Sequence, residues 1–131
     1  MKNLTIVVCD DMDDERKVAC ELLGLALPEY DLRLLEGKNF MDLVKLTLTQ
    51  KPQIILTDHN MKIGDHGTDG LRVIRGAGVN TPAIIVSGRI EQAEQANYNG
   101  GRIDNVYFLP KPYSTQELRA GIQKALPQHF S

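Results

Sequence analysis

The sequence has no tryptophan, only two cysteines and few aromatic residues, which make up 5% of its 131 residues. Two cysteines are too few for the disulfide framework of a small secreted protein. We therefore expect Cys9 and Cys20 to be small buried hydrophobic residues rather than a disulfide or a metal site. The sequence also lacks an excess of basic residues, since its net charge is −2. Without a basic field, direct binding to nucleic acid is not expected.

Long hydrophobic runs are missing as well. No run approaches the roughly 20 apolar residues that span a bilayer, and the N-terminal MKNLTIVVCDD ends its short apolar run in acidic residues. A secretory signal needs a longer apolar region followed by small residues. We therefore expect no contact with a membrane and a cytoplasmic location. The length predicts a single domain over residues 1–131, with a core at about 4–126.

What the sequence does contain is a regular alternation of strand-length apolar runs and helical stretches. Runs of β-branched and aliphatic residues predict strands at 4–9, 32–35, 54–57, 83–86 and 106–109. The spacing of apolar residues between them predicts helices at 13–27, after an Asn39 cap, around 71–74, at 90–97 and after a Ser114 capping box. The apolar faces of the first two helices are expected to hold Val18, Leu22 and Leu25, and Phe40, Leu43, Val44 and Leu46. Five strand–helix pairs predict an α/β fold, a parallel sheet with helices on both faces.

Polar residues follow four of the five predicted strands. Asp10 and Asp11 follow the first strand, Asp58 the third, Ser87 the fourth, and Lys111 comes shortly after the fifth. Each alone is unremarkable, because Asp and Ser often start turns and cap helices at strand ends. In parallel α/β sheets, however, the functional crevice lies beyond the carboxyl ends of the strands. The sequence therefore predicts that these five side chains converge.

Three carboxylates at one edge of a sheet need a counter-charge. At a separation of about 5 Å, two unit charges repel by roughly 3 kcal/mol at an effective dielectric constant near 20. An all-oxygen, acid-rich site suits Mg²⁺, or Mn²⁺ in its place. With a metal bound, a carboxylate can attack a phosphoryl group and form an aspartyl-phosphate, a reaction that depends on positioning and charge neutralisation. Lys111 and the Ser87 hydroxyl would contribute to that neutralisation.

Four segments, VVCDD, IILTDHNM, IIVSG and FLPKPY, resemble in order and spacing the signature segments of receiver domains of two-component response regulators. No single segment is specific, but together the four make the resemblance strong, and it covers the chain from Leu4 to about Leu126. Within this family, the sequence resembles the chemotaxis-response-regulator type. The resemblance implies a flavodoxin-like, doubly wound five-stranded sheet in the order 2-1-3-4-5. It also implies a signalling phosphoacceptor rather than an enzyme acting on other substrates. The implied donor is a histidine kinase or a histidine phosphotransfer protein, and the implied output is a downstream protein target or effector domain.

The resemblance assigns roles to individual residues. It implies that Asp58 is the phosphoacceptor, that Lys111 is its counter-charge, and that the Lys111–Pro112 peptide bond is cis. The implied metal ligands are Asp10, Asp11, Asp58 and the backbone carbonyl of Asn60. The implied switch residues are Ser87, whose hydroxyl would bond the phosphoryl group, and Phe108.

One segment departs from the family pattern. Lys62 stands where receivers have proline, and about four residues are inserted within Lys62–Thr68 before the family's Asp69-Gly70. The role of this inserted loop is not predicted by the resemblance. His59 and His66 flank the loop, and without the paired spacing of metal ligands they are interpreted as simple loop residues.

Three alternatives remain open from the residues. Asp11-Met12-Asp13 offers the Asp-x-Asp of a haloacid-dehalogenase-like phosphohydrolase, although Glu15 stands where Thr or Val is expected. A flavin or nucleotide binder would need a phosphate-binding loop after the first strand, and DDMDDE would repel phosphate there unless a metal intervened. The third alternative is a degenerate receiver that serves only as a docking module.

Overall fold

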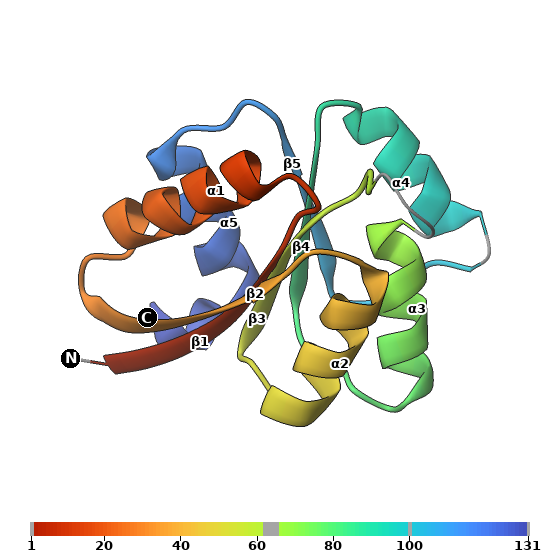
Figure 1. The fold of residues 1–131 in the computed structure, drawn as a ribbon, viewed down its shortest axis with the longest axis horizontal. Coiled ribbons are helices and arrows are strands. Elements are labelled where there is room, and N and C mark those ends of the chain that lie inside the picture. Colours follow the sequence, from red (N-terminus) through yellow and green to blue (C-terminus); the bar gives the residue numbers. More distant parts are fainter. Residues whose placement is uncertain (1, 62–65, 100, 131) are drawn as a thin grey trace.

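The computed structural model describes residues 2–61, 66–99 and 101–130, and in it strands alternate with helices along the chain (Figure 1). The strands are β1 (Lys2–Cys9), β2 (Tyr30–Gly37), β3 (Ile54–Asp58), β4 (Ala83–Ser87) and β5 (Val106–Pro110). The helices are α1 (Asp13–Ala26), α2 (Phe40–Gln50), α3 (Gly67–Gly76), α4 (Ile90–Tyr98), α5 (Thr115–Ala125) and the short 3-10 helix η1 (Pro127–His129). All strand pairs are parallel, and the order is β2-β1-β3-β4-β5. The predicted flavodoxin-like fold and its strand order are confirmed.

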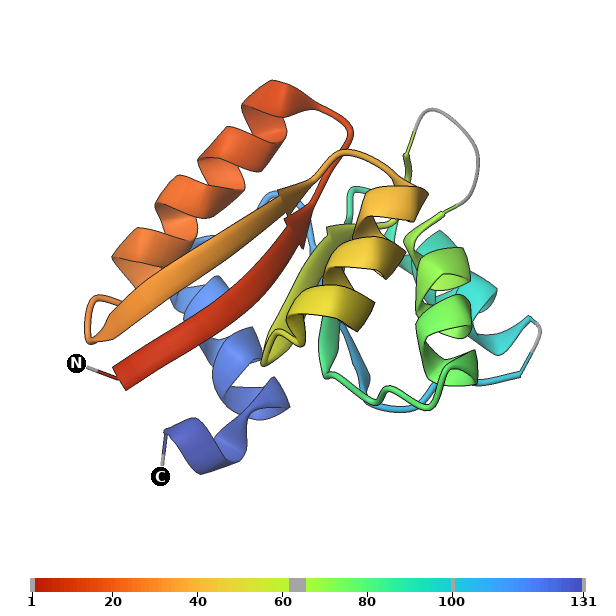
Figure 2. The ribbon, with the colours of Figure 1, turned by 60° about the horizontal axis from the view of Figure 1, so that its bottom comes forward.

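The sheet separates two helical layers. Helices α1 and α5 cover one face, and α2, α3 and α4 cover the other (Figures 1 and 2). Successive side chains of a strand point to opposite faces, so Ile6 and Val8 of β1 pack in the cluster under α1 and α5. Val7 and Cys9 pack in the cluster under the other three helices. Both faces of the central strands are therefore buried, as their continuous apolar sequence predicts.

The strand register sets where the polar residues lie. Cys9 at the end of β1 pairs with Thr57 of β3, and Asp58 pairs with Val86 of β4. Ser87 in turn pairs with Pro110 of β5. Because all the strands run in one direction, the residues that follow them meet at a single edge.

Two of the predicted helix starts are capped as the sequence indicates. The Asn39 side chain accepts a hydrogen bond from the backbone N–H of Asp42 at 2.9 Å. The Ser114 hydroxyl accepts one from the N–H of Glu117 at 3.1 Å, and the Glu117 carboxylate accepts from the N–H of Ser114 at 3.0 Å. This reciprocal capping box fixes where α5 begins.

The buried face of α1 differs from the expected one. Val18 and Leu25 are 51% and 71% exposed, whereas Ala19, Leu23 and Ala26 are buried. This helix carries two apolar stripes of similar spacing, and spacing alone does not choose between them. The observed choice places two small alanines toward the sheet and the α5 side of the core. The helix prediction is confirmed; of its expected face, Leu22 packs against the core, and the prediction is wrong for Val18 and Leu25.

No helix in the described ranges is long and apolar enough to cross a membrane. Both cysteines are free thiols; Cys9 is buried and Cys20 is half-buried. Burial raises the pKa of the Cys9 thiol to about 12, so this cysteine is an inert packing residue, as predicted.

Candidate phosphoacceptor site

Three carboxylates meet at the carboxyl edge of the sheet. Asp10 and Asp11 follow β1, and Asp58 is the last residue of β3. One oxygen of each lies within 4.8 Å of the others, an arrangement that could hold a metal ion. Asp10 and Asp58 are buried, and Asp11 is half-buried. The predicted convergence of the three carboxylates is therefore observed.

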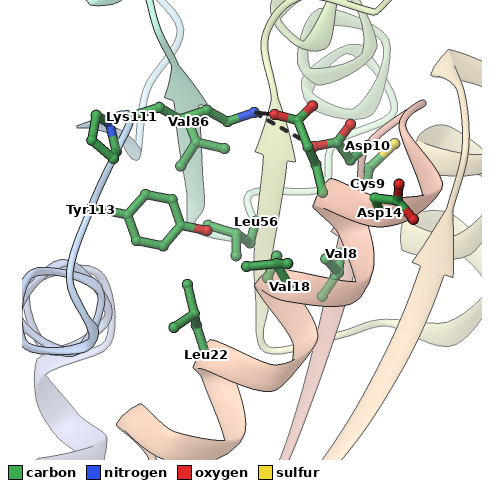
Figure 3. A pocket seen from close by; sticks show the side chains of 13 residues that line it. Val8, Cys9, Asp10, Asp14, Val18, Leu22, Leu56, Val86, Lys111 and Tyr113 are labelled. Carbon is green, nitrogen blue, oxygen red and sulfur yellow. Dashed lines mark ion pairs between the residues drawn. The ribbon is translucent and has the colours of Figure 1, made fainter.

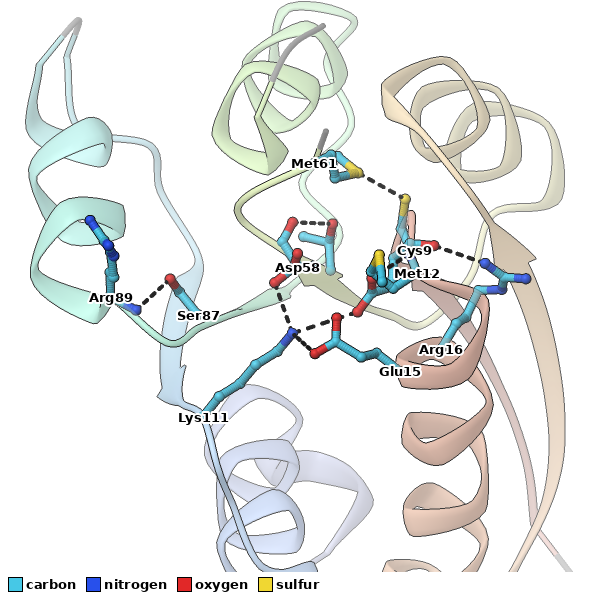
Figure 4. A network of polar contacts seen from close by, with 11 residues as sticks. Cys9, Met12, Glu15, Arg16, Asp58, Met61, Ser87, Arg89 and Lys111 are labelled. Atoms are coloured by element: carbon cyan, nitrogen blue, oxygen red, sulfur yellow. Dashed lines mark hydrogen bonds and ion pairs between the residues drawn. The ribbon is translucent and has the colours of Figure 1, made fainter. Parts of the chain in front are cut away.

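Lys111 provides the positive charge of this cluster (Figure 4). Its Nζ lies 3.1 Å from Oδ1 of Asp58 and 3.6 Å from Oδ2 of Asp10. The carboxylate of Glu15, in the first turn of α1, is not one of these three and also lies 3.5 Å from the Lys111 Nζ. The Lys111–Pro112 bond is cis, as the resemblance implies. These three distances place the Lys111 ammonium inside the site, and Glu15 joins the site as a residue that the sequence did not single out.

Burial and charge act against each other at Asp58. Burial raises the pKa of its carboxyl to about 6, with smaller contributions from Asp10 and Glu15, and Lys111 opposes this rise. The pKa of Asp10 is also raised, chiefly by burial. Burial lowers the pKa of Lys111, but the neighbouring carboxylates outweigh it and the net shift is upward. At neutral pH the site therefore holds a charged lysine beside carboxylates that gain from a further cation.

Arg16 fixes the backbone of the acidic loop. Its guanidinium is buried and donates a hydrogen bond to the backbone carbonyl of Asp10 at 2.9 Å. It also pairs with Glu36 at 3.0 Å and with Asp13 at 2.7 Å. The N–H of Met12 donates to Oδ1 of Asp10 at 2.9 Å. Asp10 is therefore held in place through both its backbone carbonyl and its side-chain carboxylate.

Ser87 is completely buried at the end of β4. Its hydroxyl accepts a hydrogen bond from the N–H of Arg89 at 2.9 Å, and its backbone carbonyl accepts one from the N–H of Lys111 at 2.9 Å. The hydroxyl is thus engaged with the loop that leads into α4. Phe108, in β5, is half-buried and packs against the cluster under α2, α3 and α4.

The segment that begins α3 approaches Asp58 closely. A Cβ on Gly67 would lie 2.7 Å from the backbone oxygen of Asp58, and the N–H of Gly67 donates to the carbonyl of His59 at 3.0 Å. Helix α3 therefore begins against the end of β3, earlier than the apolar pattern around 71–74 predicts. Residues 62–65 of the expected insertion lie outside the described residues.

His59 and His66 are not independent loop residues. His59 is 3% exposed, and its ring stacks on that of His66 with centroids 4.7 Å apart. Burial lowers the pKa of His59, and the charge of His66 lowers it further. The interpretation as simple loop residues is thus incomplete, since the stacked pair connects the end of β3 to the start of α3. Asn60, between Asp58 and the insertion, is exposed.

An apolar cavity of about 440 Å³ adjoins the charged cluster (Figure 3). Val18 and Leu22 of α1 line one side, Leu56 lies on the sheet, and Tyr113 lines the side toward α5. Lys111 borders both this cavity and the carboxylates. Val18 and Leu22 of the expected apolar face of α1 thus border this cavity, whereas Leu25 does not.

The donor set fits a hard divalent cation. Every candidate ligand in the cluster is a carboxylate oxygen, and Mg²⁺ prefers one or two carboxylates together with water and phosphate oxygens. Burial is the main cause of the upward pKa shifts of Asp10 and Asp58, and a bound cation would lower both pKa values by compensating the buried charges.

One known protein family matches most of the sequence. The family described as "Response regulator receiver domain" matches residues 6–123. A search of curated proteins found no match. Among solved structures, the receiver domain of a Francisella response regulator is 25% identical with a TM-score of 0.72, covering 97% of this chain and 99% of that one.

Two further solved structures show the same fold. The receiver domain of a sensor histidine kinase from Pseudomonas aeruginosa PAO1, which has a magnesium ion in its active-site cleft, is 21% identical with a TM-score of 0.76 and coverage of 95% and 98%. The receiver domain of PhyR from Erythrobacter litoralis is 18% identical with a TM-score of 0.77 and coverage of 100% and 95%. From the family match over most of its length, the chain belongs to the response regulator receiver domain family.

Proposed function

We propose that Asp58 accepts a phosphoryl group in a Mg²⁺-dependent reaction and that this modification switches a partner-binding surface. One observation carries the proposal: the Asp58 carboxylate is buried among two further carboxylates and an ammonium that lies 3.1 Å away. Buried like charges of this kind lower the stability of a fold, and they are typical of binding and catalytic sites. A receiver fold without phosphorylation would have no need of them.

The reaction needs few groups. An Asp58 oxygen forms a bond to phosphorus while the bond from phosphorus to the donor nitrogen breaks, and the released histidine of the donor takes up a proton. Lys111 compensates the charge that spreads over the phosphoryl oxygens. With a pKa of about 6, Asp58 is mostly ionised at neutral pH and serves as the nucleophile.

The metal would be held by Asp10, Asp11 and Asp58, with the backbone carbonyl of Asn60 as the further ligand that the family resemblance implies. When bound, Mg²⁺ (or Mn²⁺) supplies charge neutralisation between the carboxylates and the incoming phosphoryl group. Arg16 and the Met12 amide would keep Asp10 in place during this step.

Ser87 would transmit the modification. Phosphoryl oxygens accept strong, charge-assisted hydrogen bonds, so the Ser87 hydroxyl would turn from the Arg89 amide toward Asp58. The loop before α4 then loses a contact, and Phe108 on the neighbouring strand would shift inward. The changed surface would comprise α4 and β5.

The donor in this proposal is a histidine kinase or a histidine phosphotransfer protein, and the output is a protein target or effector domain. The exchange would take place in the cytoplasm. We further propose that residues 4–126 form the receiver core, that the protein is not an enzyme toward other substrates, and that it has the chemotaxis-response-regulator type suggested by its motifs.

The hydrolase alternative meets a specific obstacle. Its second aspartate, Asp13, would serve as acid and base, but the Asp13 carboxylate is paired with Arg16 at 2.7 Å on the outside of α1. That pairing lowers the pKa of Asp13, which opposes a role as a proton donor.

Phosphorylation by a small donor tests the proposal. Acetyl phosphate with Mg²⁺ should add the mass of one phosphoryl group to the intact chain, and EDTA should abolish the addition. Asp58→Asn should remain unmodified, whereas Asp31→Asn, a matched change at an exposed position of β2, should be modified like the wild type. A wild-type protein that stays unmodified under these conditions would identify a degenerate receiver instead.

A further inference from the structure

Glu15 is the exposed carboxylate of the phosphoacceptor site. Its side chain is 51% exposed, whereas those of Asp10 and Asp58 are 7% and 8% exposed. It nevertheless reaches Lys111, with Oε1 at 3.5 Å from Nζ (Figure 4). Glu15 therefore lies between solvent and Lys111, the lysine that would compensate the charge of a phosphoryl group on Asp58.

Lys111 compensates the charge of Glu15 only in part, because the same ammonium also pairs with Asp10 and Asp58. Glu15 is outside the carboxylate group that could hold a metal, which comprises Asp10, Asp11 and Asp58. The guanidinium of Arg16 is occupied by Asp13, Glu36 and the Asp10 carbonyl. A bound cation would thus neutralise the buried carboxylates and leave Glu15 as a negative charge facing an approaching donor. Its charge already acts on Asp58, whose pKa it helps to raise.

We propose that Glu15 is a specificity-determining residue that disfavours phosphodonors in proportion to their negative charge. The inference rests on the proposed function of Asp58. A small dianionic donor meets Glu15 on its way to Asp58 and is repelled. A protein donor with a neutral or basic surface around its phosphohistidine is repelled less, so the same carboxylate favours cognate proteins over free acyl phosphates.

The size of the effect follows from Coulomb's law. A unit charge at about 8 Å in water slows a dianion by about fivefold and a monoanion by about twofold. These effects should vanish in about 1 M salt, where the screening length is only about 3 Å. A dependence on donor charge and on salt is not expected from a residue that only supports the structure.

Two donors of different charge provide the test. With Mg²⁺ at low salt, Glu15→Gln should raise the second-order rate constant for acetyl phosphate by about fivefold. The increase for phosphoramidate, which has one net negative charge less at neutral pH, should be about twofold. Glu15→Asp keeps the charge and should stay near the wild type. Glu21→Gln, an exposed glutamate farther along α1, should change neither rate.

Several results would overturn the inference. Equal rate changes for the two donors, a difference that persists at high salt, or slower phosphorylation of Glu15→Gln would each show that Glu15 acts only by holding Lys111. If Glu15→Asp matched Glu15→Gln, the contact rather than the charge would matter. Failure of the proposed function is recognised separately, because the wild type itself would then not be phosphorylated by either donor.

Discussion

At the residue scale, Asp58 carries a charge that its burial opposes. Its pKa is about 6 in the folded protein and near 3.8 in an unfolded chain. Between these two values the folded state binds more protons than the unfolded state, so the free energy of unfolding falls as pH rises. This decrease in the free energy of unfolding is complete above about pH 6, and there is no decrease below the unfolded-state pKa near 3.8. Ionised Asp58 therefore destabilises the metal-free protein at neutral pH.

Replacing this carboxylate should stabilise the fold. In EDTA, Asp58→Asn should raise the free energy of unfolding by about 2 kcal/mol near pH 7, and the gain should disappear near pH 3.5. Urea unfolding at the two pH values measures the difference. A gain of equal size at both would show that packing rather than ionisation causes it.

Gly67 should be needed for the position of the acceptor. A methyl group there would lie 2.7 Å from the Asp58 carbonyl, so α3 and β3 must separate to admit it. Gly67→Ala should cost about 1–3 kcal/mol and slow phosphorylation by acetyl phosphate by about tenfold, because small displacements of a reacting group are costly. Chemical denaturation and the phosphorylation rate measure the two effects.

Gly76, at the other end of the same helix, is the matched control. A Cβ there has no neighbour within 4 Å, so Gly76→Ala should be neutral or stabilising by up to about 1 kcal/mol. If the two variants behaved alike, the close approach of Gly67 to Asp58 would have no role at the site.

The sequence predicts the strand-end residues of the site but not the residues that reach it from elsewhere. Asp10, Asp11, Asp58 and Lys111 follow apolar strands, and the parallel sheet brings such positions together. Glu15, Arg16 and Gly67 lie on or at the starts of helices. Their contacts depend on how each helix is rotated and how closely it approaches, which apolar spacing does not specify.

At the scale of elements, α4 is held differently at its two ends. Near its start, the Arg89 N–H donates to the Ser87 hydroxyl. Near its end, Arg72 of α3 donates to the carbonyls of Ala96 and Asn97, and the Asn97 side chain accepts from the N–H of Ile103 at 2.9 Å. The start of α4 thus depends on the proposed switch hydroxyl, and its end is fastened to α3.

This asymmetry predicts which part of α4 responds to activation. Beryllofluoride, a phosphoryl mimic, should speed hydrogen exchange at the Arg89 amide because it draws the Ser87 hydroxyl away. The amides of Asn99 and Ile103 should keep their protection, and the NMR signals of Phe108 should shift. Asp58→Asn should show none of these changes. Shifts confined to Asp58 and its immediate neighbours would refute the switch while leaving the acceptor role intact.

The sequence predicts most of the strands and helices, but it predicts their end residues and their buried faces less well. β2 extends from Tyr30 to Gly37, well beyond the predicted 32–35, because it pairs with β1 along its whole length. It is an edge strand of the sheet, so its ends need no apolar residues to stay paired. In α2, Leu43 is fully buried as expected, but Thr47 is buried too and Phe40 and Val44 are only half-buried. Because threonine is not counted as an apolar residue, the spacing of apolar residues does not predict that Thr47 is buried.

At the scale of the whole molecule, the edge of the sheet opposite the site is closed by the C-terminal segment. Arg119 of α5 pairs with Glu29 through contacts of 2.7 and 2.6 Å and lies over the ring of Phe130. Phe130 also packs against Tyr30, whose hydroxyl donates to the backbone of His129. These contacts tie α5 to the start of β2. They lie at the end of the sheet opposite the charged cluster and hold the scaffold rather than the site.

The central claim is that a phosphoryl group resides on Asp58. Sodium borohydride reduces an acyl phosphate to an alcohol, so treatment of the acetyl-phosphate-modified protein should convert residue 58, and only that residue, to homoserine. Peptide mass mapping reads the position directly, with Asp10 and Asp11 as internal controls in the same sample. Homoserine at position 58 that requires Mg²⁺ is the predicted result. Homoserine at Asp10 or Asp11, or its absence from a protein shown to carry the phosphoryl mass, would contradict the account.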